Sequence, residues 1–212
     1  MNNPLVPVQI YVSVIVVLII LTIFGKYKKR KWFLIVKPMT TICIIGLPLF
    51  YSSIPTIYQF LILLGLVTSL AGDIFLMFPE KYFEHGLFSF LLTHVLYTSA
   101  FVSSAEEISF LVAPIFPAYA IFIYTRLNLH DSRFKLPVLL YIIVICLMGY
   151  SAANLYIYSS VVNSEVLLGG AILFIISDSI LAYNKFSGKF RYAEALILST
   201  YFTGQLLIAS TL

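Results

Sequence analysis

The stretch that decides the fold is residues 72–77, Gly-Asp-Ile-Phe-Leu-Met, which ends an apolar run long enough to cross a bilayer. After a short polar break, the next apolar run starts at Gly86 and contains His94. A charged side chain inside a spanning helix costs about 2.5–3.5 kcal/mol on insertion scales, so such residues usually have a function. Asp178 lies in a similar context further along the chain. We therefore expect the remaining sequence to be a helical scaffold that brings these side chains together.

The composition is that of an integral membrane protein. Of the 212 residues, 61% are hydrophobic and only 10% are charged, and the mean hydropathy is +1.01. Soluble domains have about 25% charged residues. The formal net charge of +4 comes from short connections, so it indicates topology and contact with anionic lipids, not nucleic acid binding. Cys43 and Cys146 lie in apolar runs and are expected to be packing residues.

Eight apolar runs have about the length of 20 residues that a spanning helix needs. The connections between them are short, so no soluble domain is expected. We predict an all-α fold, a polytopic membrane bundle of eight transmembrane helices that forms one domain over residues 1–212. The predicted helices are 5–25, 32–51, 55–78, 86–104, 108–125, 136–159, 164–183 and 192–212.

Lysines and arginines mark one side of the membrane. They occur in the first, third, fifth and seventh connections and are absent from the second, fourth and sixth. The positive-inside rule then makes the odd connections cytoplasmic and puts both termini on the other side. Because the chain is short and shows no targeting extension, we expect a bacterial inner membrane protein.

This topology places the polar side chains at one depth. Asp73 and Asp178 each precede the cytoplasmic end of their helix by about five residues, or about 7–8 Å. Lys37, His94 and Tyr201 lie at a comparable depth from the same side. The outer halves of the helices are mostly apolar, so we expect a single site that opens toward the cytoplasmic leaflet.

The segments around the two aspartates resemble each other. Residues 72–78 read Gly-Asp-Ile-Phe-Leu-Met-Phe and residues 177–183 read Ser-Asp-Ser-Ile-Leu-Ala-Tyr. Both segments run in the same direction under the predicted topology. A parallel repeat of four plus four helices is one explanation, which rests on this short match alone.

The two aspartates are the first catalytic candidates. At one depth, desolvation and mutual repulsion would keep one carboxyl protonated while the other is ionised. Such a pair supplies a general acid next to a carboxylate that stabilises a cation or orients water. The structural alternative is that an aspartate pairs with Lys37 or bonds to a neighbouring helix.

Five other polar residues are candidates for proton transfer or substrate binding. His94 and Tyr97 share a helix face and would move a proton or anchor a head group, or else bond between helices. Lys37 would pair with a phosphate or an aspartate, or extend to the membrane surface. Tyr201 and Gln205 would line a polar pocket or bond between helices.

The sequence contains no local metal or nucleotide motif. His94, Asp73 and Asp178 would form a three-ligand zinc site if their helices met, but HxxxH and HExxH are absent, so we predict no metal and no cofactor. Walker, GxSxG and GxGxxG motifs are absent too. Asn184, just beyond Asp178, would cap its helix or contact a head group.

Many of these residues belong to one ordered pattern over about residues 35–210. Residues 83–97 read F-x2-G-x3-F-x3-H-x2-Y. The other matching residues are Lys37-Pro38, Gly72-Asp73, Leu76, Gly170-Ala171, Phe174, Ser177-Asp178, Leu181-Ala182, Asn184, Phe186, Tyr201 and Gln205. The pattern resembles the YhhN-like membrane proteins, a family that includes lysoplasmalogenase. The order and spacing carry this resemblance, and the first helix contributes nothing to it.

The resemblance implies an eight-helix hydrolase of lipid metabolism that cleaves the vinyl ether bond of lysoplasmalogen. The products would be a fatty aldehyde and glycerophosphoethanolamine or glycerophosphocholine. Its partners would be the lysophospholipid substrate and membrane lipids. The catalytic residues would then be Asp73, Asp178 and His94, and the substrate-binding residues Lys37, Tyr97, Asn184, Tyr201 and Gln205.

The carboxylate pair suits this chemistry. Vinyl ethers hydrolyse through protonation of the β carbon, which gives an oxocarbenium ion that water captures, and carboxyl pairs handle a similar ion in glycosidases. One aspartate would be the acid and the other would stabilise the cation, while His94 or Tyr97 positions water or the head group. We expect the hydrocarbon chain among the apolar outer halves of the helices and the phosphate near Lys37.

Other function classes stay open at this point. A proton-coupled small transporter would use the intramembrane Asp and His residues as a relay. The clustering of polar residues in one leaflet argues against it, while Asn154 and Ser151 in the outer half keep it open. A zinc-dependent membrane lipid amide or ester hydrolase would lose activity with chelators. A lipid-binding protein without turnover is the simplest alternative.

Overall fold

Helices make up almost all of the computed structural model, which describes residues 5–28, 30–50, 56–105, 107–130, 132–158 and 163–212. Within these residues there are eight α-helices, one short 3-10 helix at Leu47–Phe50 and no strand, which confirms the all-α prediction. The α-helices are α1 (Leu5–Lys28), α2 (Arg30–Gly46), α3 (Ile57–Leu76), α4 (Pro79–Ser103), α5 (Ile115–Arg126), α6 (Ser132–Tyr158), α7 (Ser164–Phe186) and α8 (Ala193–Ala209).

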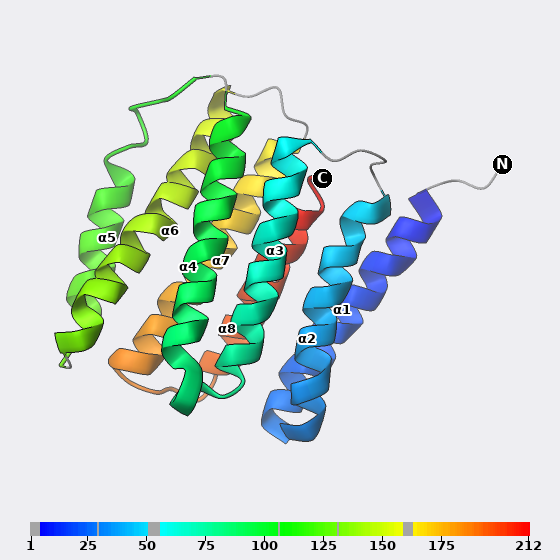
Figure 1. Cartoon of the computed structure of the whole chain (residues 1–212), viewed down its shortest axis with the longest axis horizontal. Coiled ribbons are helices and arrows are strands. Elements are labelled where there is room, and N and C mark those ends of the chain that lie inside the picture. The colour runs from blue at the N-terminus through cyan, green and yellow to red at the C-terminus, as the bar shows by residue number, and fades with distance from the viewer. Residues whose placement is uncertain (1–4, 29, 51–55, 106, 131, 159–162) are drawn as a thin grey trace.

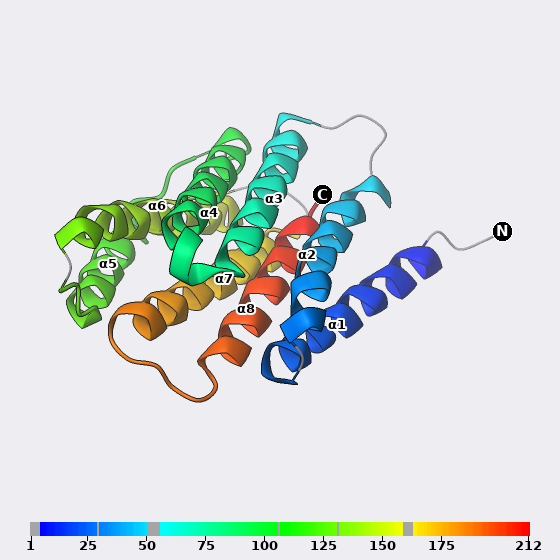
Figure 2. The ribbon, with the colours of Figure 1, turned by 60° about the horizontal axis from the view of Figure 1, so that its bottom comes forward.

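The helices run up and down between two ends of a bundle (Figure 1). The connections α1–α2, α3–α4, α5–α6 and α7–α8 lie at the lower end in Figure 1, while α1 begins and α8 ends at the upper end. Helices adjacent in sequence pack as pairs, α3 on α4 and α7 on α8, and α4 also packs on α6. The α1–α2 hairpin lies on one flank of the bundle and α5 on the opposite flank (Figure 2).

The length and surface of the helices fit an integral membrane protein. Among the described residues, five helices, α1, α3, α4, α6 and α7, are long and apolar enough to span a membrane, and α8 is a shorter apolar helix. Large apolar side chains point outward, such as Phe88 with 67% exposed and Ile121 with 66% exposed. In a bilayer these side chains would face lipid hydrocarbon instead of water.

The fifth helix is shorter than predicted. It was expected over residues 108–125 but starts at Ile115, directly after Pro114, because a proline disfavours helical backbone in the residue before it. In the preceding segment the Ser109 amide donates to Asn154 Oδ1 (2.5 Å) and the Tyr150 hydroxyl donates to Ser109 O (2.7 Å). These bonds replace helical ones. With 12 residues, α5 is about 18 Å long, less than the hydrocarbon core of about 30 Å.

Other helix ends differ by a few residues. The fourth helix starts at Pro79 instead of residue 86, since proline is well tolerated in the first turn, and its backbone departs from helical geometry at Tyr82 (φ −123°, ψ 21°). The second helix ends at Gly46 and continues as the 3-10 helix. The predicted ends at residues 51, 55 and 159 lie outside the described residues.

Glycines let the helices that carry the aspartates approach their neighbours closely. A Cβ atom on Gly170 of α7 would lie only 2.9 Å from the carbonyl oxygen of Gly204 in α8. A Cβ atom on Gly72 of α3 would lie 2.7 Å from the Phe90 ring of α4. Small residues at such crossings bring membrane helices into backbone contact. This packing brings α3, which carries Asp73, against α4, and α7, which carries Asp178, against α8.

Candidate active site

Asp73 on α3 is held by side chains from two other helices. Lys37 Nζ of α2 lies 3.1 Å from Asp73 Oδ1, and the same ammonium donates to the Asp73 carbonyl oxygen at 3.3 Å. The hydroxyls of Thr41 (2.5 Å) and Tyr201 on α8 (2.8 Å) donate to Oδ2. Asp73 is 1% exposed and Lys37 is 5% exposed. Because a cation and hydroxyl donors surround this carboxylate, its surroundings fit an ionised aspartate.

Asp178 on α7 has a different set of partners. The Tyr141 hydroxyl of α6 donates to Asp178 Oδ2 at 2.5 Å, and His94 Nε2 of α4 lies 2.9 Å from the same oxygen. His94 Nε2 also lies 3.0 Å from the Tyr141 hydroxyl, so the three groups form a closed triangle. His94 is fully buried, whereas Asp178 is 8% exposed. Tyr141 is also 8% exposed, so Asp178 and Tyr141 are the members of the triangle that reach open space.

The second nitrogen of His94 contacts another residue of α6. His94 Nδ1 is 3.2 Å from Met148 Sδ, and a thioether sulfur is a weak acceptor that cannot donate. Nε2 lies within hydrogen-bonding distance of both Asp178 Oδ2 and the Tyr141 hydroxyl. This contact gives His94 and Asp178 a direct path for proton exchange.

Both aspartates line one polar cavity. Its empty volume is about 1060 Å³, including open space at its mouth, and it has Lys37 and Tyr201 in its wall beside Asp73 and Asp178. Charged side chains from the lower end of the bundle surround the mouth, together with Asn184. These are Lys26, Glu80, Lys185, Lys189 and Glu194. The cavity thus connects the buried carboxylates with the end of the bundle that carries the odd connections.

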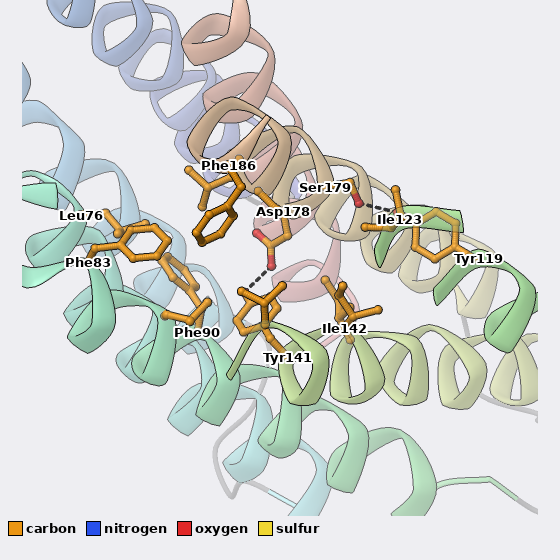
Figure 3. A pocket seen from close by; sticks show the side chains of 15 residues that line it. Leu76, Phe83, Phe90, Tyr119, Ile123, Tyr141, Ile142, Asp178, Ser179 and Phe186 are labelled. Carbon is orange, nitrogen blue, oxygen red and sulfur yellow. Dashed lines mark hydrogen bonds between the residues drawn. The ribbon is translucent and has the colours of Figure 1, made fainter. Parts of the chain in front are cut away.

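An apolar slot adjoins this cavity. Figure 3 shows Asp178 pointing into the slot between Phe83 on one side and Tyr119 and Ile123 on the other. The slot has an empty volume of about 610 Å³ and is lined mostly by apolar side chains of α4, α5, α6 and α7, together with Leu76 at the end of α3. Five lining residues belong to both spaces, namely Leu76, Phe83, Phe90, Asp178 and Leu181. Asp178 therefore lies at the junction between a polar and an apolar space.

The structure brings together most, though not all, of the predicted site residues. Asp73, Asp178, Lys37, Tyr201 and Asn184 line the cavity, and His94 is bonded to Asp178. The remaining two, Tyr97 and Gln205, are fully buried outside the cavity. The Tyr97 hydroxyl donates to Gln205 Oε1 at 2.5 Å and joins α4 to α8. Among the interactions of the described residues, none joins the two carboxylates directly.

Polar residues in the outer half of the bundle, away from the cavity, are hydrogen-bonded to backbone groups. Asn154 accepts from the Ser109 amide and donates to the Tyr150 carbonyl, and the Ser151 hydroxyl donates to the Leu147 carbonyl. Over the residues that the structure describes, no group of three or more His, Cys, Asp or Glu side chains is arranged to hold a metal ion.

Sequence reasoning missed three residues of the site: Thr41, Tyr141 and Met148. Thr41 lies four residues after Lys37 and so on the same helix face, which was an available signal. Tyr141 and Met148 lie in a long apolar run, where a tyrosine suggests the membrane interface and a methionine suggests the core. Nothing in their local sequence marks them as partners of His94.

The Lys37–Asp73 pair gives a prediction for stability. Lys37→Met leaves an ionised carboxylate buried without its cation and should lower the free energy of unfolding by about 3–5 kcal/mol. Lys37→Met/Asp73→Asn removes both charges and should recover most of this loss. Thermal unfolding in detergent measures both effects. Lys26→Met is the control, because its pair with Glu194 is partly exposed and contributes about 0–1 kcal/mol. Asp73→Asn is measured as the second single variant. If the double variant loses as much free energy of unfolding as the two single variants lose together, the pairing is contradicted.

Comparison with known proteins identifies the family. Lysoplasmalogenase TMEM86A of Bos taurus is 37% identical over 154 residues, which cover 70% of this chain and 63% of that protein. The human protein of the same name is 37% identical over 153 residues, again 63% of its length. The chain thus spans less than two thirds of these relatives.

A bacterial relative matches over a greater length. The uncharacterized membrane protein YhhN of Escherichia coli O157:H7 is 27% identical over 192 residues, 86% of this chain and 87% of that protein. No solved structure shows a significant match. The model of the YhhN family matches residues 32–212, which leaves out α1 with Lys26 and includes both aspartates and the side chains bonded to them. The chain belongs to the YhhN family.

Proposed function

We propose that this protein hydrolyses the vinyl ether bond of lysoplasmalogens. The observation that carries the proposal is the position of Asp178 between a charged cavity and an apolar slot. A lysoplasmalogen has a charged head group and a hydrocarbon chain, and its vinyl ether lies between the two. With the head group in the cavity and the chain in the slot, the reactive bond is beside Asp178. The names of the TMEM86A relatives support the same reaction.

The first step is protonation of the β carbon of the vinyl ether. The Asp178–His94 pair supplies the proton, and the π electrons of the double bond form the new C–H bond. The α carbon and the ether oxygen then share a positive charge, and Asp178 is left as a carboxylate next to it. Unit charges about 4 Å apart attract by about 4 kcal/mol at an effective dielectric constant of about 20. Such an attraction corresponds to about a thousandfold in rate.

The second step is the capture of the cation by water. A water oxygen bonds to the α carbon and its proton returns to the Asp178–His94 pair, which gives a hemiacetal. The hemiacetal then loses its hydroxyl proton and breaks the bond to the glycerol oxygen, which takes up a proton. One water is consumed, and the products are a fatty aldehyde and a glycerophospho alcohol.

The other residues hold this arrangement in place. Asp73, fixed by Lys37, Thr41 and Tyr201, is a second negative charge in the cavity wall that orients water and favours the cation. Tyr141 keeps the Asp178 carboxyl turned toward the junction through its hydrogen bond (Figure 3). The buried Tyr97–Gln205 bond positions α4 against α8.

The cavity opens at one end of the bundle, which determines the side of the membrane on which the reaction would occur. The charged mouth of the cavity is at the end of the bundle that carries the odd, basic connections. The positive-inside rule makes this end cytoplasmic and puts both termini on the other side of a bacterial inner membrane. The slot lies at the same end, whereas the sequence suggested the outer halves of the helices for the hydrocarbon chain. The substrate would therefore come from the cytoplasmic leaflet.

Aldehyde release by purified protein tests the reaction. A lysoplasmalogen should yield aldehyde, and its saturated ether analogue should not. Asp178→Asn should lower the rate by about 10²–10⁴-fold, the usual contribution of a general acid. Asp73→Asn should lower it by about 10²–10³-fold through loss of a fixed charge. Both variants should keep their helical circular dichroism spectrum.

Two outcomes of the same assay would overturn the proposal. Loss of activity in EDTA would indicate a metal-dependent lipid hydrolase. Well-folded protein that releases no aldehyde would exclude the reaction and leave transport or lipid binding.

The slot can be tested separately from the chemistry. Ala182→Phe places a ring in the slot and should lower activity on a long-chain lysoplasmalogen about tenfold or more, because contacts with several methylene groups are lost. Activity on a short-chain vinyl ether should remain. Ile172→Phe on the outer face of α7, where Ile172 is 47% exposed, is the control. Equal losses on both substrates would show that the slot does not hold the chain.

A further inference from the structure

Five charged side chains surround the mouth of the cavity, and they differ in how well they are paired. Lys26 and Glu194 form an ion pair at 3.0 Å, so their charges largely cancel. Glu80, Lys185 and Lys189 have no ion-pair partner within the described part of the chain. The mouth therefore offers two cationic groups and one carboxylate to a ligand.

This combination fits a zwitterion. We propose that the mouth selects lysophospholipids with a primary ammonium head group, such as phosphoethanolamine, over those with a trimethylammonium head group, such as phosphocholine. The inference rests on the proposed function for the lysophospholipid itself and extends it to the head group.

The two lysines are suited to the phosphate. Lys185 is in the last turn of α7 and Lys189 in the connection to α8, and both line the cavity. Lysine ammonium groups bind phosphate oxygens through charge-assisted hydrogen bonds. Lys37, the phosphate ligand suggested by the sequence, is buried and bonded to Asp73 instead. Since both head groups contain a phosphate, these contacts do not discriminate between them.

Glu80 is the residue that distinguishes the ethanolamine head group from the choline head group. It lies in the first turn of α4 and lines the same cavity as the two lysines. A primary ammonium has N–H donors that hydrogen-bond to a carboxylate, whereas a trimethylammonium has none. A hydrogen bond to a charged group strengthens binding about tenfold or more.

The aromatic side chains that line the cavity are not arranged to bind a choline head group. Proteins recognise quaternary ammonium groups with open aromatic faces. Here Lys26 lies over the Phe33 ring at 5.0 Å, and Lys185 lies over the Phe83 ring at 4.5 Å. The other lining rings, Phe90 and Tyr201, are about 5% exposed or less and pack edge to face at 5.6 Å. No aromatic side chain of the described lining thus offers a free face to a quaternary ammonium group.

Binding of saturated 1-alkyl lysophospholipids tests this inference without turnover. The ethanolamine and choline analogues, which lack the vinyl ether, compete with a fluorescent lysophospholipid in detergent. We expect the ethanolamine analogue to bind about tenfold or more tightly than the choline analogue. Glu80→Gln should abolish this preference. Lys185→Gln and Lys189→Gln should lower the affinity for both analogues by a similar factor.

The control is Glu165→Gln, which makes the same charge change in the first turn of α7, at the other end of the bundle. It should leave the preference intact. Equal affinity of the two analogues, a preference that survives in Glu80→Gln, or no binding of either analogue would overturn the inference. Preferential binding by protein that releases no aldehyde from a lysoplasmalogen would support the head-group site and refute the proposed reaction alone.

Discussion

A carboxyl group buried in a membrane bundle must have partners, and this requirement determines how six of the helices meet. Asp73 on α3 is bonded by side chains of α2 and α8, and Asp178 on α7 by side chains of α4 and α6. Leaving either group without partners would cost several kcal/mol, so the contacts of these two residues select one packing of the bundle. In the described residues, α1 and α5 contribute no such partner, and both lie on the flanks (Figure 2).

The same contacts separate the two carboxyls chemically. Asp73 is beside a cation and accepts from two hydroxyls, while Asp178 is bonded to His94 and Tyr141. The two carboxyls thus face one cavity with different partners. We propose that this difference in partners, instead of repulsion between the aspartates, provides the acid for the vinyl ether and the charge that stabilises the oxocarbenium ion.

Hydropathy and charge were sufficient to predict the helices and the convergence of the polar residues. Burial of Asp73, His94 and Asp178 follows from their place in apolar runs, since the cost of burying them requires a shared polar environment. The start of α5 was missed because hydropathy does not report the backbone constraint of Pro114. The partners of each aspartate could not be predicted, since Tyr141 looks like any interfacial tyrosine in sequence. The repeat of four plus four helices stays a prediction.

The most direct test of the central claim is hydrolysis in D2O, with the aldehyde trapped at once by borohydride and analysed by mass spectrometry. Proton transfer to the β carbon predicts one deuterium on carbon 2 of the resulting alcohol. Because the acid approaches from one face only, this deuterium should be in a single stereochemical position. Product without deuterium at carbon 2 would show that the double bond is not protonated there, and would contradict the role assigned to the Asp178–His94 pair.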